Sequence, residues 1–122
     1  MFSVSALKVQ TSDGRNFVLL EPFTYTSLAG EIIVVAAGAT SDGASTPKEI
    51  WPVIPPFGTY WMAAFLHDYL YRCTDKPKAE CDALLKEAMT SLGVDTIMRD
   101  MIYDGVTVGG WSSFEADRKA QT

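Results

Sequence analysis

The only histidine of the chain, His67, is followed directly by Asp68 and, one helical turn later, by Tyr71. Imidazole has an ordinary pKa of about 6.5, so it serves as a general base at neutral pH. These polar groups stand in a nearly continuous apolar run from Tyr60 to Tyr71. Burying a polar group without a partner costs about 1–3 kcal/mol. The pattern therefore predicts either proton-transfer chemistry or a polar contact that holds the core together.

A partner for His67 follows from helix geometry. Residues 60–73 predict one helix and residues 78–92 a second, joined by a short loop, so the two should form an antiparallel hairpin. His67 lies about 9 Å before the loop and Asp82 about 7.5 Å after it. We therefore predict a His67–Asp82 pair, with the Tyr71 hydroxyl as a further donor to Asp82. Asp82 is the charged residue on the apolar seam of the second helix, whereas these residues are expected mostly off it: Lys78, Glu80, Lys86 and Glu87.

The pattern His67-Asp68-x-x-Tyr71 with a later aspartate resembles the secreted phospholipases A2, especially the small bacterial and fungal group. The resemblance includes Asp42-Gly43-Ala44-Ser45-Thr46-Pro47, Pro55-Pro56-Phe57 and the helix Ala63–Arg72. It implies that His67 is the general base and that Asp82 orients it. It also implies that Asp42, Asp68 and the Gly43 carbonyl bind Ca²⁺, which prefers oxygen ligands. Zinc usually takes more His or Cys ligands than one histidine supplies.

The chain differs from the bacterial and fungal group in its cysteines and in its N-terminal segment. Ala44 and Ala64 stand where the bacterial enzymes have cysteines, and a β-rich segment precedes the loop. This β-rich start, the Asp-Gly-Ala-Ser-Thr-Pro segment and the Leu-His-Asp-Tyr-Leu-Tyr helix also look like an uncharacterised family from tailed phages and prophages. That likeness covers nearly the whole chain. It implies a place in the host cytoplasm or the virion, and a phage or host protein as partner.

The arrangement of elements predicts one α+β domain. Residues 1–40 should form a small antiparallel β-sheet, residues 41–58 an irregular proline-rich loop, and residues 59–111 a region of three helices around a phospholipase A2-like hairpin. Residues 112–122 are polar and are expected to be a flexible tail.

Composition limits the partners. The net charge of −5 argues against nucleic acid, whose phosphates would be repelled, and weakly against anionic bilayers. No run of about 18 apolar residues predicts a transmembrane segment, and no signal peptide is expected. Two cysteines are too few for a disulfide scaffold. Cys73 and Cys81 flank the hairpin turn; free thiols are favoured there over a bridge.

Aromatic residues suggest where a phospholipid or membrane surface would bind. Aromatic residues beside a proline-rich loop either rim a cleft or fill the core. Both alternatives remain open for four residues: Trp51, Phe57, Trp61 and Trp111. Asp68 has the alternatives of capping loop amides or pairing with Arg72.

Three functions stay open at this point. The first is a calcium-dependent esterase of the phospholipase A2 type. The second is a non-enzymatic phage protein, a virion component or an inhibitor of host defence, that keeps the polar cluster as scaffold. The third is another hydrolase with the same pair, acting for instance on cell-wall material.

Overall fold

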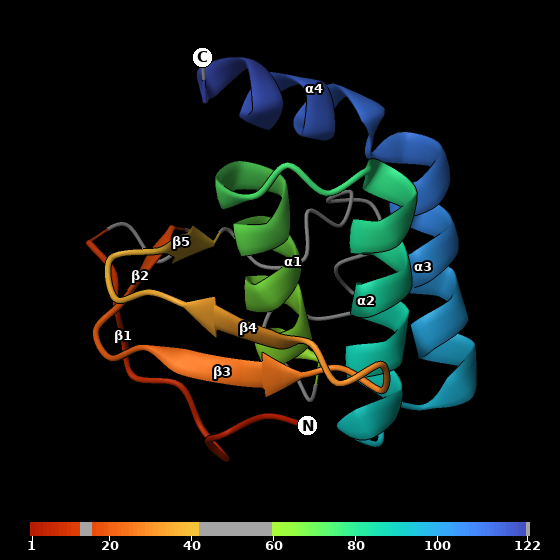
Figure 1. Cartoon of the computed structure of the whole chain (residues 1–122). Coiled ribbons are helices and arrows are strands. Elements are labelled where there is room, and N and C mark those ends of the chain that lie inside the picture. Colours follow the sequence, from red (N-terminus) through yellow and green to blue (C-terminus); the bar gives the residue numbers. More distant parts are fainter. Residues whose placement is uncertain (13–15, 42–59, 122) are drawn as a thin grey trace.

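The computed structural model describes residues 1–12, 16–41 and 60–121 (Figure 1). Short strands come first and helices follow, which confirms the predicted α+β class. The strands are β1 (Val9–Gln10), β2 (Phe17–Leu19), β3 (Phe23–Thr26), β4 (Ile32–Val35) and β5 (Thr40–Ser41). The helices are α1 (Trp61–Cys73), α2 (Lys78–Ser91), α3 (Thr96–Gly109) and α4 (Trp111–Ala120). The predicted proline-rich loop lies outside the described residues except for Ser41, which ends β5.

The strands pair antiparallel in two small sheets rather than in the one sheet predicted. One sheet has the order β1-β2-β5, and the other is the hairpin β3-β4, in which Tyr25 faces Ile33. Pro22 separates β2 from β3, because proline has no N–H to continue a ladder. Alternate side chains of these strands enter the core, as the period of two requires: Phe17, Leu19, Phe23, Tyr25, Ile33 and Val35.

The first two helices form the predicted hairpin. The chain turns between Cys73 and Lys78, with Pro77 directly before α2, and α2 packs between α1 and α3 (Figure 1). Nine of the thirteen residues of α1 are buried, which accounts for the apolar character of most of its circumference. Asp95 begins α3 by accepting hydrogen bonds from the amides of Ile97 and Met98. None of the helices in the described part of the chain has both the length and the apolar character needed to cross a bilayer.

The C-terminal segment differs from the prediction. Residues 111–120 form α4, whereas the polar residues 112–122 were predicted to be a flexible tail. The Phe114 ring packs edge-on against Tyr71 at 5.1 Å, and Arg118 donates to the carbonyl oxygens of Leu70 and Tyr71. These tertiary contacts hold a segment that has little apolar periodicity of its own.

One side chain of α2 joins the β3–β4 hairpin to the helices. The buried hydroxyl of Tyr25 donates to Glu87 Oε1 at 2.6 Å, and the amide of Leu28 donates to the same oxygen at 2.9 Å. The carboxylate thus fixes both the middle of β3 and the turn that follows it.

We expect Glu87→Ala to lower the free energy of unfolding by roughly 1–3 kcal/mol, because the Tyr25 hydroxyl, on a side chain only 1% exposed, would lose this acceptor. Urea denaturation measures the change. The control is Glu80→Ala, on the same helix, which removes a surface ion pair to Lys76 and should cost less than about 1 kcal/mol. Equal losses in the two variants would contradict a structural role for the Tyr25–Glu87 contact.

Candidate active site

The carboxylate of Asp82 is the centre of a buried polar cluster. Its Oδ1 accepts hydrogen bonds from His67 Nε2 at 2.7 Å and from the Tyr71 hydroxyl at 2.6 Å. Its Oδ2 accepts from Lys78 Nζ at 2.7 Å. None of the four residues is more than 5% exposed. The structure therefore brings together the three residues predicted to be catalytic, and adds a lysine to them.

Helix spacing explains how the four side chains meet. His67 and Tyr71 lie one turn apart on α1, and Lys78 and Asp82 lie one turn apart on α2. The antiparallel hairpin sets the two pairs against each other. The imidazole and phenol rings also touch, with centroids 4.1 Å apart, so the histidine ring is held by packing as well as by its hydrogen bond.

The prediction that Lys78 lies off the seam was wrong. Its Nζ reaches the end of α3 as well as Asp82, donating to the carbonyl oxygens of Val106 at 2.7 Å and Thr107 at 3.3 Å. The Val106 carbonyl also accepts from the Gly110 amide at 2.9 Å, and the partial negative charge at the C-terminus of a helix favours an ammonium group there. The i,i+4 spacing from Asp82 was the signal for this contact. Only the position of α3, however, brings the remaining acceptors to the ammonium.

The hydrogen bonds determine the charge of Asp82. Burial by itself raises the pKa of this carboxyl, but the bonds from His67, Lys78 and Tyr71 outweigh burial and bring the pKa below its ordinary value. An ionised carboxylate only accepts, so the proton of the imidazole lies on Nε2 and the basic nitrogen is Nδ1. Burial raises the pKa of Tyr71, and its bond to Asp82 raises it further, so the phenol stays a donor.

A small cavity borders the imidazole. It has a volume of about 50 Å³, and its walls come from His67, Tyr71 and the α3–α4 junction. That volume holds a few water molecules at most and has no room for an acyl chain. The cavity is therefore suited to a water molecule next to the histidine.

The predicted metal ligand Asp68 lies on α1 and contacts the end of β5. It is 2% exposed, and its Oδ2 accepts a hydrogen bond from the Ser41 hydroxyl at 2.6 Å. Arg72, the alternative partner for Asp68, donates to the Thr40 carbonyl and lies 3.6 Å from Asp117.

The calcium site stays a prediction. Asp42 and Gly43 lie outside the described residues, so their distance from Asp68 is not defined. Within residues 1–12, 16–41 and 60–121, no three side chains of the metal-binding types converge. Such convergence is not required of the predicted set, because one of its ligands is a backbone carbonyl.

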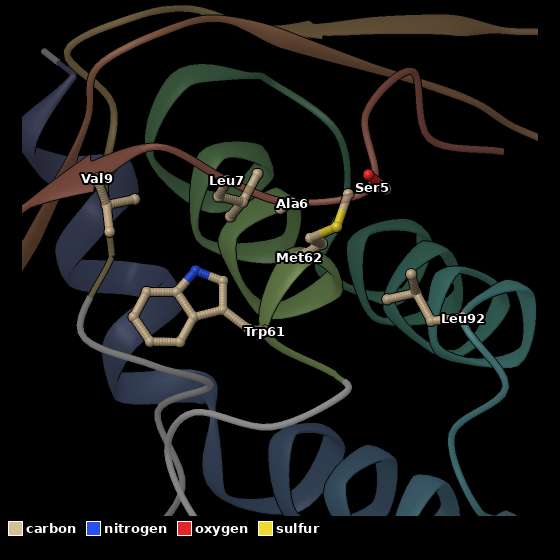
Figure 2. A pocket seen from close by; sticks show the side chains of 7 residues that line it. All are labelled: Ser5, Ala6, Leu7, Val9, Trp61, Met62 and Leu92. Atoms are coloured by element: carbon tan, nitrogen blue, oxygen red, sulfur yellow. The ribbon is translucent and has the colours of Figure 1, made fainter.

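Of the predicted substrate-binding aromatics, the structure describes Trp61 and leaves Trp51 and Phe57 outside. The Trp61 ring packs against Phe17 at 4.8 Å and borders a cavity of about 540 Å³ beside the N-terminal segment (Figure 2). His67 is not among the residues around that cavity. Trp61 lies about a third of a turn away from His67 around α1, so the structure does not bring it to the imidazole.

The two cysteines are free thiols, so no disulfide closes the α1–α2 turn. Cys73 is exposed and Cys81 is buried. Burial raises the pKa of Cys81 to about 11, which keeps this thiol protonated and unreactive at neutral pH.

The sequence profile of one protein family matches residues 17–106, and the chain belongs to that family, described as "Protein of unknown function (DUF1353)". The matched region begins at β2 and includes the whole cluster around Asp82, and it ends before α4. No curated protein and no solved structure matches the chain.

Asp82→Asn is expected to destabilise the protein by roughly 3–5 kcal/mol at pH 7, because it leaves the Lys78 ammonium buried without its counter-charge. A carboxyl whose pKa is lowered on folding stabilises the protein above its unfolded pKa, about 3.9, and loses that contribution as pH falls through the folded pKa. The stability gap between wild type and variant should therefore narrow below about pH 4.

Denaturant unfolding at pH 7, 5 and 3 measures this gap. Asp75→Asn, in the exposed α1–α2 turn, is the matched control and should change stability little at pH 7. A gap for Asp82→Asn that stays constant down to pH 3 would contradict an ionised Asp82.

Proposed function

We propose that this member of the DUF1353 family is a hydrolase in which His67 activates water for attack on an acyl ester. The observation that supports this proposal most is the 2.7 Å contact between His67 Nε2 and Asp82. It fixes the ring and its tautomer, and it leaves Nδ1 to accept a proton from water. A histidine, an orienting carboxylate and an adjacent water-sized cavity are the parts that such a general base requires.

Ester hydrolysis also needs positive charge where the oxyanion develops. Lys78 does not supply it, because its three donors are engaged by Asp82 and by two carbonyls of α3. A bound Ca²⁺ would supply that charge. In this proposal Asp68 contributes a carboxylate to the ion, with Asp42 and the Gly43 carbonyl as the further ligands that the resemblance implies. The Ser41–Asp68 bond supports the set, since it holds the residue that precedes Asp42 against Asp68.

The substrate in this proposal is a glycerophospholipid at a membrane surface. Its support is the sequence pattern shared with the secreted phospholipases A2: a histidine-aspartate pair, a tyrosine one turn later and an orienting aspartate on the next helix. The contacts of Tyr71 and Asp82 are consistent with that pattern. The likeness to tailed-phage and prophage proteins supports a role in phage entry or lysis.

A second candidate is a non-catalytic phage protein, a virion component or an inhibitor of host defence. The observation in its favour is that His67 is only 2% exposed and borders a cavity too small for a phospholipid. The groups of His67, Tyr71 and Lys78 that face Asp82 are each hydrogen-bonded to its carboxylate, as in a purely structural cluster. In this case the cluster around Asp82 stabilises the hairpin and does no chemistry.

The two candidates differ in what His67→Asn does. For the hydrolase, the variant should keep its fold and lose at least about a hundredfold in fatty-acid release from phospholipid mixed micelles, the contribution expected of a general base. Ca²⁺ should raise the melting temperature of the wild type, and EDTA should abolish release.

Asp75→Asn makes the same kind of change at an exposed residue of the α1–α2 turn, outside the cluster, and should leave release unchanged. If wild type releases no fatty acid with Ca²⁺ present, and if His67→Asn and Asp68→Asn alter only the melting temperature, the non-catalytic candidate is correct.

A further inference from the structure

We propose that α4 is a lid over the cavity at His67, latched to the C-terminal end of α1 by Arg118. The helix crosses the molecule at the end where α1 stops and α2 begins (Figure 1). Gly110, directly before α4, and Ser113, in its first turn, form part of the cavity wall opposite His67 and Tyr71. Movement of α4 away from α1 would therefore open the cavity to solvent.

The latch is a guanidinium group that donates to carbonyls at the end of α1 and in the turn after it. Arg118 Nε donates to the Tyr71 carbonyl at 2.9 Å, and Nη2 donates to the Leu70 carbonyl at 3.1 Å and the Lys76 carbonyl at 2.5 Å. The Gln121 side chain adds bonds to the carbonyls of Tyr71 and Thr74. The carbonyls of Leu70 and Tyr71 carry the partial negative charge of a helix C-terminus, so a cation binds well there.

Besides the latch, α4 has an ion pair between Arg72 Nε and Asp117 Oδ1 at 3.6 Å and a contact between the Lys78 ammonium and the Trp111 ring at 5.0 Å. None of its residues is buried, and its aromatic contact to α1 is the Phe114 ring on Tyr71. Arg118 packs over the same Phe114 ring at 4.6 Å, so the aromatic contact and the latch are one unit. A helix with few buried contacts opens at lower free energy than the core, which suits a segment that must move.

The junction before α4 is shaped to pack closely on the cluster around Asp82. A Cβ at Gly110 would come within 2.4 Å of the Val106 carbonyl oxygen and 3.3 Å of the Tyr71 hydroxyl, so only glycine fits there. Tyr71 is thereby engaged at both ends: its carbonyl accepts from Arg118, and its hydroxyl donates to Asp82. The state of the lid and the environment of the imidazole are coupled through this one residue.

The family match ends at residue 106, so α4 lies beyond the region that defines the family. The purpose of such a lid rests on the proposed function, but the accessibility of His67 is measurable without any substrate. Failure of the lid and failure of the hydrolase are therefore distinguishable.

The test uses diethyl pyrocarbonate, which modifies accessible imidazoles, with the rate at His67 followed by peptide mass spectrometry. The chain has one histidine, so the signal has one source. Wild type should react slowly, and Arg118→Ala should react about tenfold faster while keeping its circular dichroism spectrum, since charged hydrogen bonds of the latch are lost. Arg99→Ala, on α3 with hydrogen bonds to Asp100 and Thr90, is the matched control and should react like wild type.

An unchanged rate at His67 in folded Arg118→Ala would overturn the proposal. If that variant fails to fold, native-state hydrogen exchange of the wild type decides instead. The lid requires the amides of α4 to exchange well before those of α1. Equal protection of the two helices would overturn it.

Discussion

The helical half of this protein depends on one buried negative charge. Removing a carboxylate from water costs several kcal/mol, and the protein offsets that cost with three donors on Asp82, one of them a full positive charge from Lys78. The donors come from both α1 and α2, and Lys78 extends the contact to α3. The packing of three helices is thus tied to the satisfaction of a single group.

The strand half is joined to the helices in a similar way. Ser41, at the end of β5, donates to Asp68 on α1, and Tyr25, in the middle of β3, donates to Glu87 on α2. In each case a strand hydroxyl meets a helix carboxylate at the edge of the common core. Apolar packing brings the strands and the helices together, but it is not directional and does not fix their relative orientation. These polar contacts fix how the strands are seated on the helices.

The same cluster is compatible with a structural and a chemical role, because both require an ordered imidazole. The position of the cluster supports the proposed chemistry: His67 borders a cavity, and part of the cavity wall comes from the start of α4, a helix with no buried residue. An imidazole that acts on water must be shielded at one time and accessible at another.

The sequence by itself determined the helix hairpin and the meeting of His67, Tyr71 and Asp82. Helical periodicity and a short turn are local properties, and together they fix which side chains face each other. Only the tertiary structure decided the burial of Lys78 and the helical state of residues 111–120. Besides Asp82, Lys78 donates to carbonyls of α3, and Arg118 of α4 donates to carbonyls of α1. Every residue has a backbone carbonyl, so the sequence does not show which carbonyls will accept these hydrogen bonds. The acceptors are defined only once the distant helices have been placed.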